Sequence, residues 1–398
     1  MKDVFVVDAV RTPVGKYGGA LANTRPDDLA ARVIKKIIER NKNIDVNKIE
    51  DVIFGAANQA GEDNRDVARM ALLLAGLPIH IGGNTVNRLC SSGLQAIIDA
   101  SRAIKCGDGE IYLAGGTESM TRAPFVMAKS NSAFQRTSEI YDTTIGWRFT
   151  NKKLAELYHP FSMGETAENV AEKYKITRSE QDEFAFVSQK KYDDAHKTGK
   201  FSDELISVEI KNEKGEEILF SKDEHPRLSP IEKLAALKPA FKKDGTVTAG
   251  NSSGINDGAA CLILVSEDYL TQNKITPLAK IKSVAVAGVD PAYMGIGPVP
   301  AVKKALQRAN LSVNEIDLWE LNEAFASQSI ACIRDLEIDI AKVNVNGGAI
   351  AIGHPLGCSG ARISTTLLHE MKRRNSKHGV ATMCVGVGQG VAIVYERI

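Results

Sequence analysis

Residues 86–94 read Val-Asn-Arg-Leu-Cys-Ser-Ser-Gly-Leu, and the fold and chemistry of the chain are organised around them. An extended segment ends at Asn87, and a helical pattern begins just after Cys90, with Leu94 and Ile97 on one face. Cys90 therefore lies at a strand-to-helix turn, where unpaired N–H groups and the helix dipole favour negative charge. We expect a thiol here to have a lowered pKa and to act as a nucleophile, although a single Cys on an apolar element is more often a buried hydrophobic residue.

Strands and helices alternate on both sides of this turn. A strand at 3–10, a helix at 27–40, a strand at 51–55 and a helix at 65–75 precede it, and a strand at 110–115 follows its helix. This βαβ alternation predicts a parallel or mixed sheet that helices cover on both faces.

Residues 121–249 interrupt the alternation. Strand signals thin out, charge density rises, and Thr177-Arg-Ser-Glu is a capping box that predicts a helix to about Ala195. A solvated insertion explains most of these residues, but excursions of this length often have a binding role. Strand patterns resume at 259–265 and 279–289.

The second half of the chain repeats the first. Residues 45–52, Asp-Val-Asn-Lys-Ile-Glu-Asp-Val, match residues 312–319, Ser-Val-Asn-Glu-Ile-Asp-Leu-Trp, and Ser91-Ser-Gly-Leu matches Cys358-Ser-Gly-Ala. Both matches have the same offset, because 312 − 45 and 358 − 91 both equal 267. An internal duplication, with the charged segment inserted in the first copy, accounts for this. Two packed copies would bring the turn quoted above opposite its counterpart at 353–360.

Further turns hold reactive side chains. His354 lies in a glycine-rich turn, where we interpret it as a general base. Cys384 is followed by Gly386 in a turn that leads into a strand, not into the helix that a dinucleotide-binding loop requires, so the turn suits a second thiol with N–H groups facing a substrate. Asn322 is either a helix N-cap or an amide that positions water or stabilises an oxyanion.

Composition and charge exclude several classes of protein. The net charge of the 398 residues is +1, which gives no basic surface for nucleic acid, and no apolar run approaches the roughly 20 residues of a membrane span. The six cysteines are scattered singly, which argues against a disulfide framework and against a structural zinc site. We expect a cytoplasmic protein that has no metal site.

Six motifs recur along the chain in a recognisable order. They are Asn-Arg-Leu-Cys-Ser-Ser-Gly around Cys90, Met-Gly-Glu-Thr-Ala-Glu from Met163, Gly250–Gly258, Asn-Glu-Ala-Phe-Ala from Asn322, Gly-His-Pro from Gly353 and Cys-Val-Gly-Val-Gly-Gln-Gly from Cys384. With these motifs the chain resembles the thiolase family over essentially its whole length. The resemblance implies an α/β/α/β/α sandwich of two βαβαβαββ halves, which we assign to residues 1–120 with 250–272 and to residues 273–398, and a loop domain at 121–249.

The resemblance implies a role for each reactive residue. Cys90 would attack a 3-ketoacyl-CoA, His354 would take its proton, and Cys384 would protonate the acetyl-CoA enolate that leaves. His354 and a water held by Asn322 would stabilise one oxyanion. The backbone N–H groups of Cys90 and Gly386 would stabilise the other.

The resemblance also implies the ligands and partners. CoA and acyl-CoA are substrates, the loop domain supports CoA, and Arg227 and Ser253 stand at matching positions. No metal or redox cofactor is implied. We expect a homodimer or homotetramer in which the first-half sheets of two subunits pair.

Some positions depart from short-chain members of the family. Ser162 stands where many acetoacetyl-CoA thiolases have His, and Val387 and Gln389 are closer to degradative than to biosynthetic members. Residues 57–65, 122–127 and 142–149 look most like 3-oxoadipyl-CoA and related 3-ketoacyl-CoA thiolases, and Arg148 is a candidate cation for a dicarboxylate.

We therefore favour a degradative thiolase, with acetoacetyl-CoA synthesis from two acetyl-CoA as the alternative. A decarboxylating ketoacyl synthase would carry a second His in place of Asn322 and would lack Cys384. A non-catalytic CoA-binding protein would have no reason to hold Cys90, His354 and Cys384 in three separate glycine-lined turns.

Overall fold

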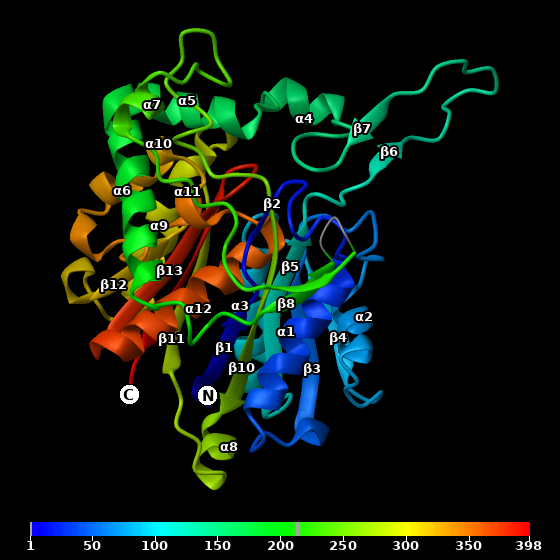
Figure 1. The fold of residues 1–398 in the computed structure, drawn as a ribbon, viewed down its shortest axis with the longest axis vertical. Coiled ribbons are helices and arrows are strands. Elements are labelled where there is room, and N and C mark those ends of the chain that lie inside the picture. The colour runs from blue at the N-terminus through cyan, green and yellow to red at the C-terminus, as the bar shows by residue number, and fades with distance from the viewer. Residues whose placement is uncertain (1, 212–214) are drawn as a thin grey trace.

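The computed structural model describes residues 2–211 and 215–398, and most of its strands form one mixed sheet of ten strands (Figure 1). These strands are β1 (Val4–Arg11), β2 (Gly15–Lys16), β3 (Ile49–Gly55), β4 (Gly82–Val86), β5 (Ile111–Ser119), β10 (Asn256–Ser266), β11 (Ala279–Gly288), β12 (Leu318–Leu321), β13 (His378–Val385) and β14 (Gln389–Glu396). Their order across the sheet is β12-β13-β14-β11-β1-β10-β5-β3-β4, and β2 pairs with β10.

The sheet consists of two half-sheets joined at one edge. In the first, β3 pairs in parallel with β4 and β5, and β10 runs antiparallel between β1 and β5. In the second, β12 and β13 are parallel and β14 is antiparallel to β13 and β11. The short ladder of Phe5–Lys280 and Val6–Ala279 joins β1 to β11. A single parallel bridge from Trp319 to Val343 lies beside β12, where the expected fifth strand of this half would run.

The helices form three layers around the two half-sheets. A central core contains side chains of both half-sheets together with α3 and α12, a second packs α1 and α2 on the first half-sheet, and a third packs α9 and α10 on the second. The result is the five-layered order that the family resemblance implies. These helices are α1 (Pro26–Arg40), α2 (Val67–Leu74), α3 (Ser92–Cys106), α9 (Pro298–Ala309), α10 (Ala326–Asp335) and α12 (Leu356–Arg374), with α8 (Glu267–Gln272) and α11 (Ala349–Ile352) as short connections.

The two central helices cross in close contact at equivalent glycines. A Cβ atom on Gly93 of α3 would lie 2.7 Å from the backbone nitrogen of Ala361, and one on Gly360 of α12 would lie 2.2 Å from that of Leu94. Only glycine allows this approach, so the Gly in both copies of the Ser-Gly repeat has a packing reason. The crossing brings the two N-terminal turns together, which confirms the expected juxtaposition of Cys90 with the second-copy turn.

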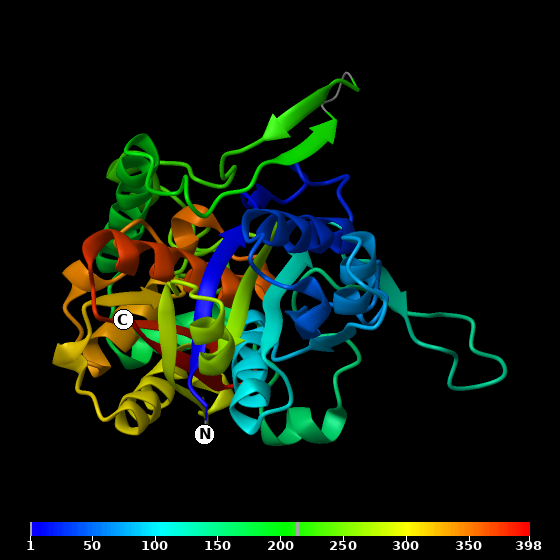
Figure 2. The same ribbon diagram turned by 90° about the horizontal axis from the view of Figure 1, so that it is seen from below.

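In the described part of residues 121–249, α4 and α5 lie over the end of the sandwich where these turns meet (Figure 1), whereas Ile206 and Val208 pack with α1 on the first half-sheet. The ribbon of β6 and β7 and its connection extend away from the body (Figures 1 and 2), with Phe134 93% exposed. Thr177 and Glu180 form the expected capping box at the start of α6. The elements are β6 (Phe125–Met127), β7 (Ile140–Asp142), α4 (Lys152–Leu157), α5 (Met163–Lys173), α6 (Arg178–Lys197), β8 (Val208–Lys211), β9 (Glu217–Phe220) and α7 (Ile231–Ala235).

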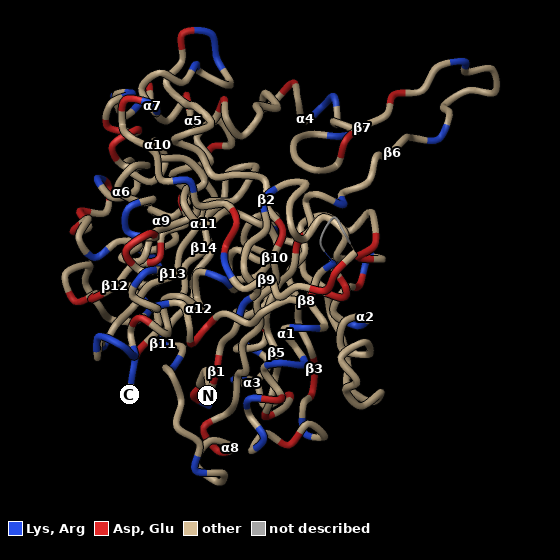
Figure 3. Tube along the Cα trace, viewed as in Figure 1, with Lys and Arg blue, Asp and Glu red and all other residues tan. Residues whose placement is uncertain are grey.

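Charged residues of both signs are scattered along the whole trace, without a segregated basic face (Figure 3). Among the described residues, no helix combines the length and apolar character that crossing a membrane requires.

Candidate active site

The Cys90 turn is held by hydrogen bonds from both halves of the chain. Ser92, at the start of α3, accepts a hydrogen bond from the backbone N–H of Arg88 (2.9 Å) and donates one to the carbonyl of Leu89 (2.6 Å). The guanidinium of Arg88 donates to the side chain of Gln389 in β14 (2.8 Å), which ties the turn to the second half. Leu89 adopts a positive φ of 48°, so the chain bends sharply just before the thiol.

The Cys90 thiol does not have the lowered pKa that the sequence led us to expect. Burial raises its pKa to about 11, and the backbone N–H groups of Gly386 and of Cys90 itself oppose this rise only in part. The expectation was wrong because it counted the helix N-terminus and not the loss of water around the sulfur. The resting enzyme therefore holds a thiol, and attack requires a base. Gly386 does lie against the sulfur, as the motif implied.

A cavity of about 200 Å³ opens beside Cys90. Its walls come from the Cys90 turn, residues 57–58, the loop after β7, the start of α5 and the turn after β13. The lining residues are Ala57, Asn58, Leu89, Cys90, Thr143, Thr144, Ile145, Gly146, Trp147, Arg148, Ser162, Met163, Leu356, Gly386 and Val387. Ser162 and Arg148, which the sequence suggested for the acyl group, thus line the same cavity as the thiol.

His354 is buried and its orientation is fixed from two sides. Its Nδ1 lies 2.6 Å from Oγ of Ser359, and that hydroxyl donates its proton to the carbonyl of Pro355 (2.8 Å). The hydroxyl can therefore only accept from the ring, which places the proton on Nδ1 and leaves Nε2 free to act as a base. The backbone N–H of His354 donates to Oδ1 of Asn256 (2.9 Å). Burial, and secondarily the charge of Arg362, lowers the pKa of His354 to about 3, so the resting imidazole is neutral.

Asn322 lies beside His354 and does not cap a helix. Its amide nitrogen is 3.4 Å from both ring nitrogens of His354, and helix α10 begins later, with Phe325 as its N-cap residue. The N-cap interpretation is therefore wrong. Oδ1 of Asn322 is buried and has no hydrogen-bond partner among the described residues. A buried acceptor without a partner is typical of a site that holds water.

Cys384 lies near the end of β13, 2% exposed, in an apolar cluster with Met163 and Phe325. Burial raises the pKa of its thiol well above the ordinary value, and the next largest cause is the sulfur of Cys90. Cys384 therefore stays protonated at neutral pH, close to the proposed nucleophile. Cys358, in contrast, belongs to the central hydrophobic core.

Glu118, near the end of β5, links the segment beside Cys90 to the segment that follows His354. Its buried carboxylate accepts hydrogen bonds from the backbone N–H groups of Ala57 (2.9 Å), Asn58 (3.1 Å) and Gly357 (2.7 Å). Ala57 and Asn58 line the Cys90 cavity, and Gly357 follows the His354 turn. Burial raises the pKa of Glu118 to about 7, while the three N–H groups oppose the rise.

Arg227 and Ser253 lie away from this cavity. Arg227 lines a separate cavity of about 340 Å³, and Ser253 follows that cavity's wall at Gly250, with its backbone N–H bonded to the carbonyl of Ala324 (3.0 Å). Ser253 thus contacts the Asn322 motif, whereas Arg227 bonds to Gln189 and Ala249. The cavity is lined by Phe186, Gln189, Arg227, Ser229, Lys233, Leu234, Leu237, Ala249 and Gly250.

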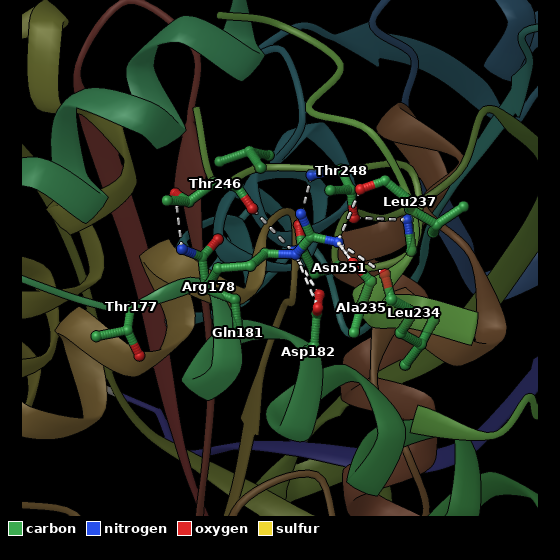
Figure 4. Close-up of polar contacts among 12 residues, drawn as sticks. Thr177, Arg178, Gln181, Asp182, Leu234, Ala235, Leu237, Thr246, Thr248 and Asn251 are labelled. Carbon is green, nitrogen blue, oxygen red and sulfur yellow. Dashed lines mark hydrogen bonds and ion pairs between the residues drawn. The ribbon is translucent and has the colours of Figure 1, made fainter. Parts of the chain in front are cut away.

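One wall of the Arg227 cavity is fixed by Arg178 of α6 (Figure 4). Its guanidinium donates to the carbonyls of Leu234 (2.7 Å) and Leu237 (3.0 Å), and its Nε donates to Asp182 (2.7 Å). Asp182 in turn accepts from the side chain of Asn251 (2.9 Å). This network joins α6, the end of α7 and the segment before β10.

The sequence reasoning missed Ser359, Asn256 and Glu118. Ser359 could have been found, because the offset of 267 makes it the counterpart of Ser92, and both hydroxyls brace a turn. Asn256 lies within the Gly250–Gly258 motif, but its partner His354 is 98 residues away, and nothing local distinguishes Glu118 from other polar residues at strand ends.

The comparisons with known proteins agree with this geometry. The family model "Thiolase, N-terminal domain" matches residues 4–268 and "Thiolase, C-terminal domain" matches residues 275–397. The chain is 52% identical over 401 residues to the "3-oxoadipyl-CoA/3-oxo-5,6-dehydrosuberyl-CoA thiolase" of Escherichia coli K12, and 48% identical over 399 residues to the "Acetyl-CoA acetyltransferase" of Cupriavidus necator. Both matches cover 100% of this chain and of the relative.

A solved structure gives the same result. The crystal structure of human mitochondrial 3-ketoacyl-CoA thiolase in complex with CoA superposes with a TM-score of 0.93 at 42% sequence identity, covering 100% of this chain and 98% of that one. The thiolase fold that the family resemblance implied is thereby confirmed. With both halves matched along almost their whole length, the chain belongs to the thiolase family of acyltransferases.

Proposed function

We propose that this thiolase cleaves 3-ketoacyl-CoA with CoA, giving acetyl-CoA and a shortened acyl-CoA, and that its acyl group ends in a carboxylate, as in 3-oxoadipyl-CoA. The observation that carries the proposal is that Cys90 and Arg148 line one small cavity. The "3-oxoadipyl-CoA" in the name of the Escherichia coli relative supports the same substrate class.

The first half of the reaction uses both thiols. Sγ of Cys90 attacks the C3 carbonyl carbon while its proton passes to Nε2 of His354, whose neutral state suits it to accept. The C2–C3 bond then breaks, and its electron pair stays on C2 of the departing acetyl-CoA. Cys384, protonated at neutral pH, gives its proton to C2 and regains one from the His354 imidazolium. The shortened acyl group remains on Cys90 as a thioester.

The second half returns the enzyme to its starting state. His354 takes the proton of the CoA thiol, and the CoA sulfur attacks the acyl carbonyl. The thiolate of Cys90 leaves and recovers the proton from the imidazolium. The transition states require donors to the developing oxyanions. The Gly386 N–H already points at Cys90, and the unpartnered Oδ1 of Asn322 suits it to orient a water.

The difference in pKa between Cys90 and His354 makes this stabilisation necessary. A thiol with a pKa of about 11 and an imidazole with a pKa of about 3 do not form an ion pair in the resting site. Proton transfer therefore becomes favourable only together with attack on the carbonyl, when the oxyanion meets its donors.

Arg148 is the proposed anchor for the terminal carboxylate. Its side chain makes no hydrogen bond or ion pair with any other residue that the structure describes, although it borders the cavity. A cation without a partner at this place suits a ligand carboxylate, which an Arg can bind through two parallel hydrogen bonds. Ser162, smaller than the His of many acetoacetyl-CoA thiolases, leaves space beside it.

The test is kcat/KM for acetoacetyl-, 3-oxohexanoyl- and 3-oxoadipyl-CoA in CoA-dependent cleavage. The wild type should prefer 3-oxoadipyl-CoA. Arg148→Ala should lose about 10- to 150-fold on that substrate alone, since a hydrogen-bonded charge contributes about 1.5–3 kcal/mol. Arg136→Ala, on the exposed β6–β7 connection, is the matched control. A wild-type preference for acetoacetyl-CoA would instead favour the function named for the Cupriavidus necator relative.

We also propose that the subunits associate at least as dimers. β4 is the last strand of the sheet, and beside it Leu73, Leu74 and Ile79 are 41%, 56% and 80% exposed. An unpaired strand edge next to exposed apolar side chains is typical of a surface that pairs with a second copy.

A further inference from the structure

Besides the Cys90 and Arg227 cavities there is a cavity of about 290 Å³ that borders the Cys90 cavity; we call it the second cavity of the acyl side. The two cavities share Trp147 and Val387. The second is lined by Trp147, Leu154, Tyr158, His159, Val289, Pro291 and Val387, so α4 forms one side and the segment after β11 forms another.

The indole of Trp147 is fixed as a partition between them. Its Nε1–H donates to the carbonyl of Phe161 at 3.0 Å. The Phe161 backbone N–H bonds to the carbonyl of His159 (2.8 Å), and the two rings meet edge to face at 4.4 Å. The residue that divides the cavities is thus tied to the segment that forms the far wall of the second.

The second cavity extends the acyl side of the site and not the CoA side. No residue that lines the Arg227 cavity lines either of the other two. Ser253, three residues after Gly250 of the Arg227 cavity, bonds to Ala324 of the Asn322 motif, whereas the space behind Trp147 lies between α4 and residues 289–291. CoA and the distal end of the acyl group therefore have separate spaces.

We propose that Trp147 limits the length of the acyl chain by closing the Cys90 cavity, and that the space behind it is a subsite for the distal part of a longer apolar acyl group. The inference rests on the proposed function. The lining of the second cavity is apolar or aromatic except for His159, which fits an unbranched alkyl chain. Shortening residue 147 removes the larger of the two side chains that line both cavities, the other being Val387, and so opens a passage between them.

The experiment compares 3-oxodecanoyl-CoA with 3-oxohexanoyl-CoA in CoA-dependent cleavage. The quantity measured is the ratio of their kcat/KM values. Trp147→Ala should raise this ratio by about tenfold or more, the least effect expected when a pocket gains or loses a methylene. Trp147→Leu should raise the ratio as well, and this variant replaces Trp147→Ala in the test if the alanine variant folds poorly. Leu157→Ala, 75% exposed on α4 and lining neither cavity, should leave the ratio unchanged.

A second substitution distinguishes two causes of a raised ratio, namely access to the space behind Trp147 and a general loss of order in the active site. Leu154 lines only the second cavity, so adding Leu154→Trp to Trp147→Ala should fill the new space and return the ratio towards the wild-type value. A gain that survives the added tryptophan, or an unchanged ratio in both Trp147 variants, would overturn the inference.

The outcome is distinguishable from failure of the proposed function. A wild type that cleaves no 3-ketoacyl-CoA with CoA contradicts the function itself. A wild type that cleaves 3-oxohexanoyl-CoA, with a ratio that Trp147 does not control, contradicts only the inference about the partition.

Discussion

Removal of the Ser359 hydroxyl should make His354 a weaker base, although Ser359 itself does not contact the substrate. The hydroxyl accepts the Nδ1–H of His354 at 2.6 Å, and Ser359 is fully buried and lines none of the cavities described above. During attack on the substrate the imidazole becomes an imidazolium, and the same hydrogen bond becomes charge-assisted and stronger. The bond therefore stabilises the transition state more than the resting site.

The expected size follows from leaving a buried N–H unpaired. Such a group costs about 1–3 kcal/mol, and each 1.36 kcal/mol in the barrier changes the rate about tenfold. Ser359→Ala should therefore lower kcat by about 5- to 150-fold and leave KM within about twofold. Ser359→Thr keeps a hydroxyl and should recover much of the loss.

Steady-state cleavage of 3-oxoadipyl-CoA, followed by the loss of enolate absorbance, measures both constants. Ser364→Ala is the matched control, because Ser364 is a buried serine of the same helix whose hydroxyl accepts a hydrogen bond from Tyr395 (2.9 Å) away from the site. A kcat for Ser359→Ala within twofold of wild type, or an equal fall in kcat for Ser364→Ala, would refute the role given to this hydrogen bond.

Three further predictions concern pH, CoA and assembly. Burial raises the pKa of Glu118 to about 7, so protonation below that pH removes an acceptor for the backbone N–H groups that donate to its carboxylate. Wild-type kcat/KM should therefore fall on the acid side of pH 7. In a pH–rate profile, Glu118→Gln should be slower at every pH and should lack this acid limb. Arg178→Ala frees the wall of the Arg227 cavity and should raise KM for CoA several-fold with little change in kcat, whereas Arg136→Ala should change neither. Sedimentation at micromolar concentration should give at least twice the 43.0 kDa of one chain, and a fully active monomer would contradict the expected pairing at β4.

The sequence was sufficient to predict the layers of the fold because the signals are local or repeated. Hydrophobic periodicity placed the helix at 27–40 against the observed Pro26–Arg40, and the offset of 267 predicted that the Cys90 and His354 turns meet. Strand ends were less accurate. The strand expected at 110–115 runs on to Ser119, because pairing with β10 extends it beyond its apolar run.

The electrostatics of the site could not be predicted in the same way. The pKa of Cys90 depends on burial in the folded structure and on the N–H of Gly386, more than 290 residues away in the sequence, whereas the helix dipole that suggested a lower pKa is local. Glu118 meets Gly357 across the interface of the two halves for the same reason. The division of roles among Cys90, Cys384 and His354 stays a prediction until it is tested chemically.

The most direct test is to locate the covalent acyl group. Brief exposure of the enzyme to labelled acetyl-CoA, followed by acid quench and trypsin, separates the three candidate thiols, since Cys90 lies in the peptide 89–102, Cys358 in 343–362 and Cys384 in 378–397. We expect the acetyl group on residues 89–102, and no label there in Cys90→Ser. Label on either other peptide, with none on residues 89–102, would show that Cys90 is not the nucleophile.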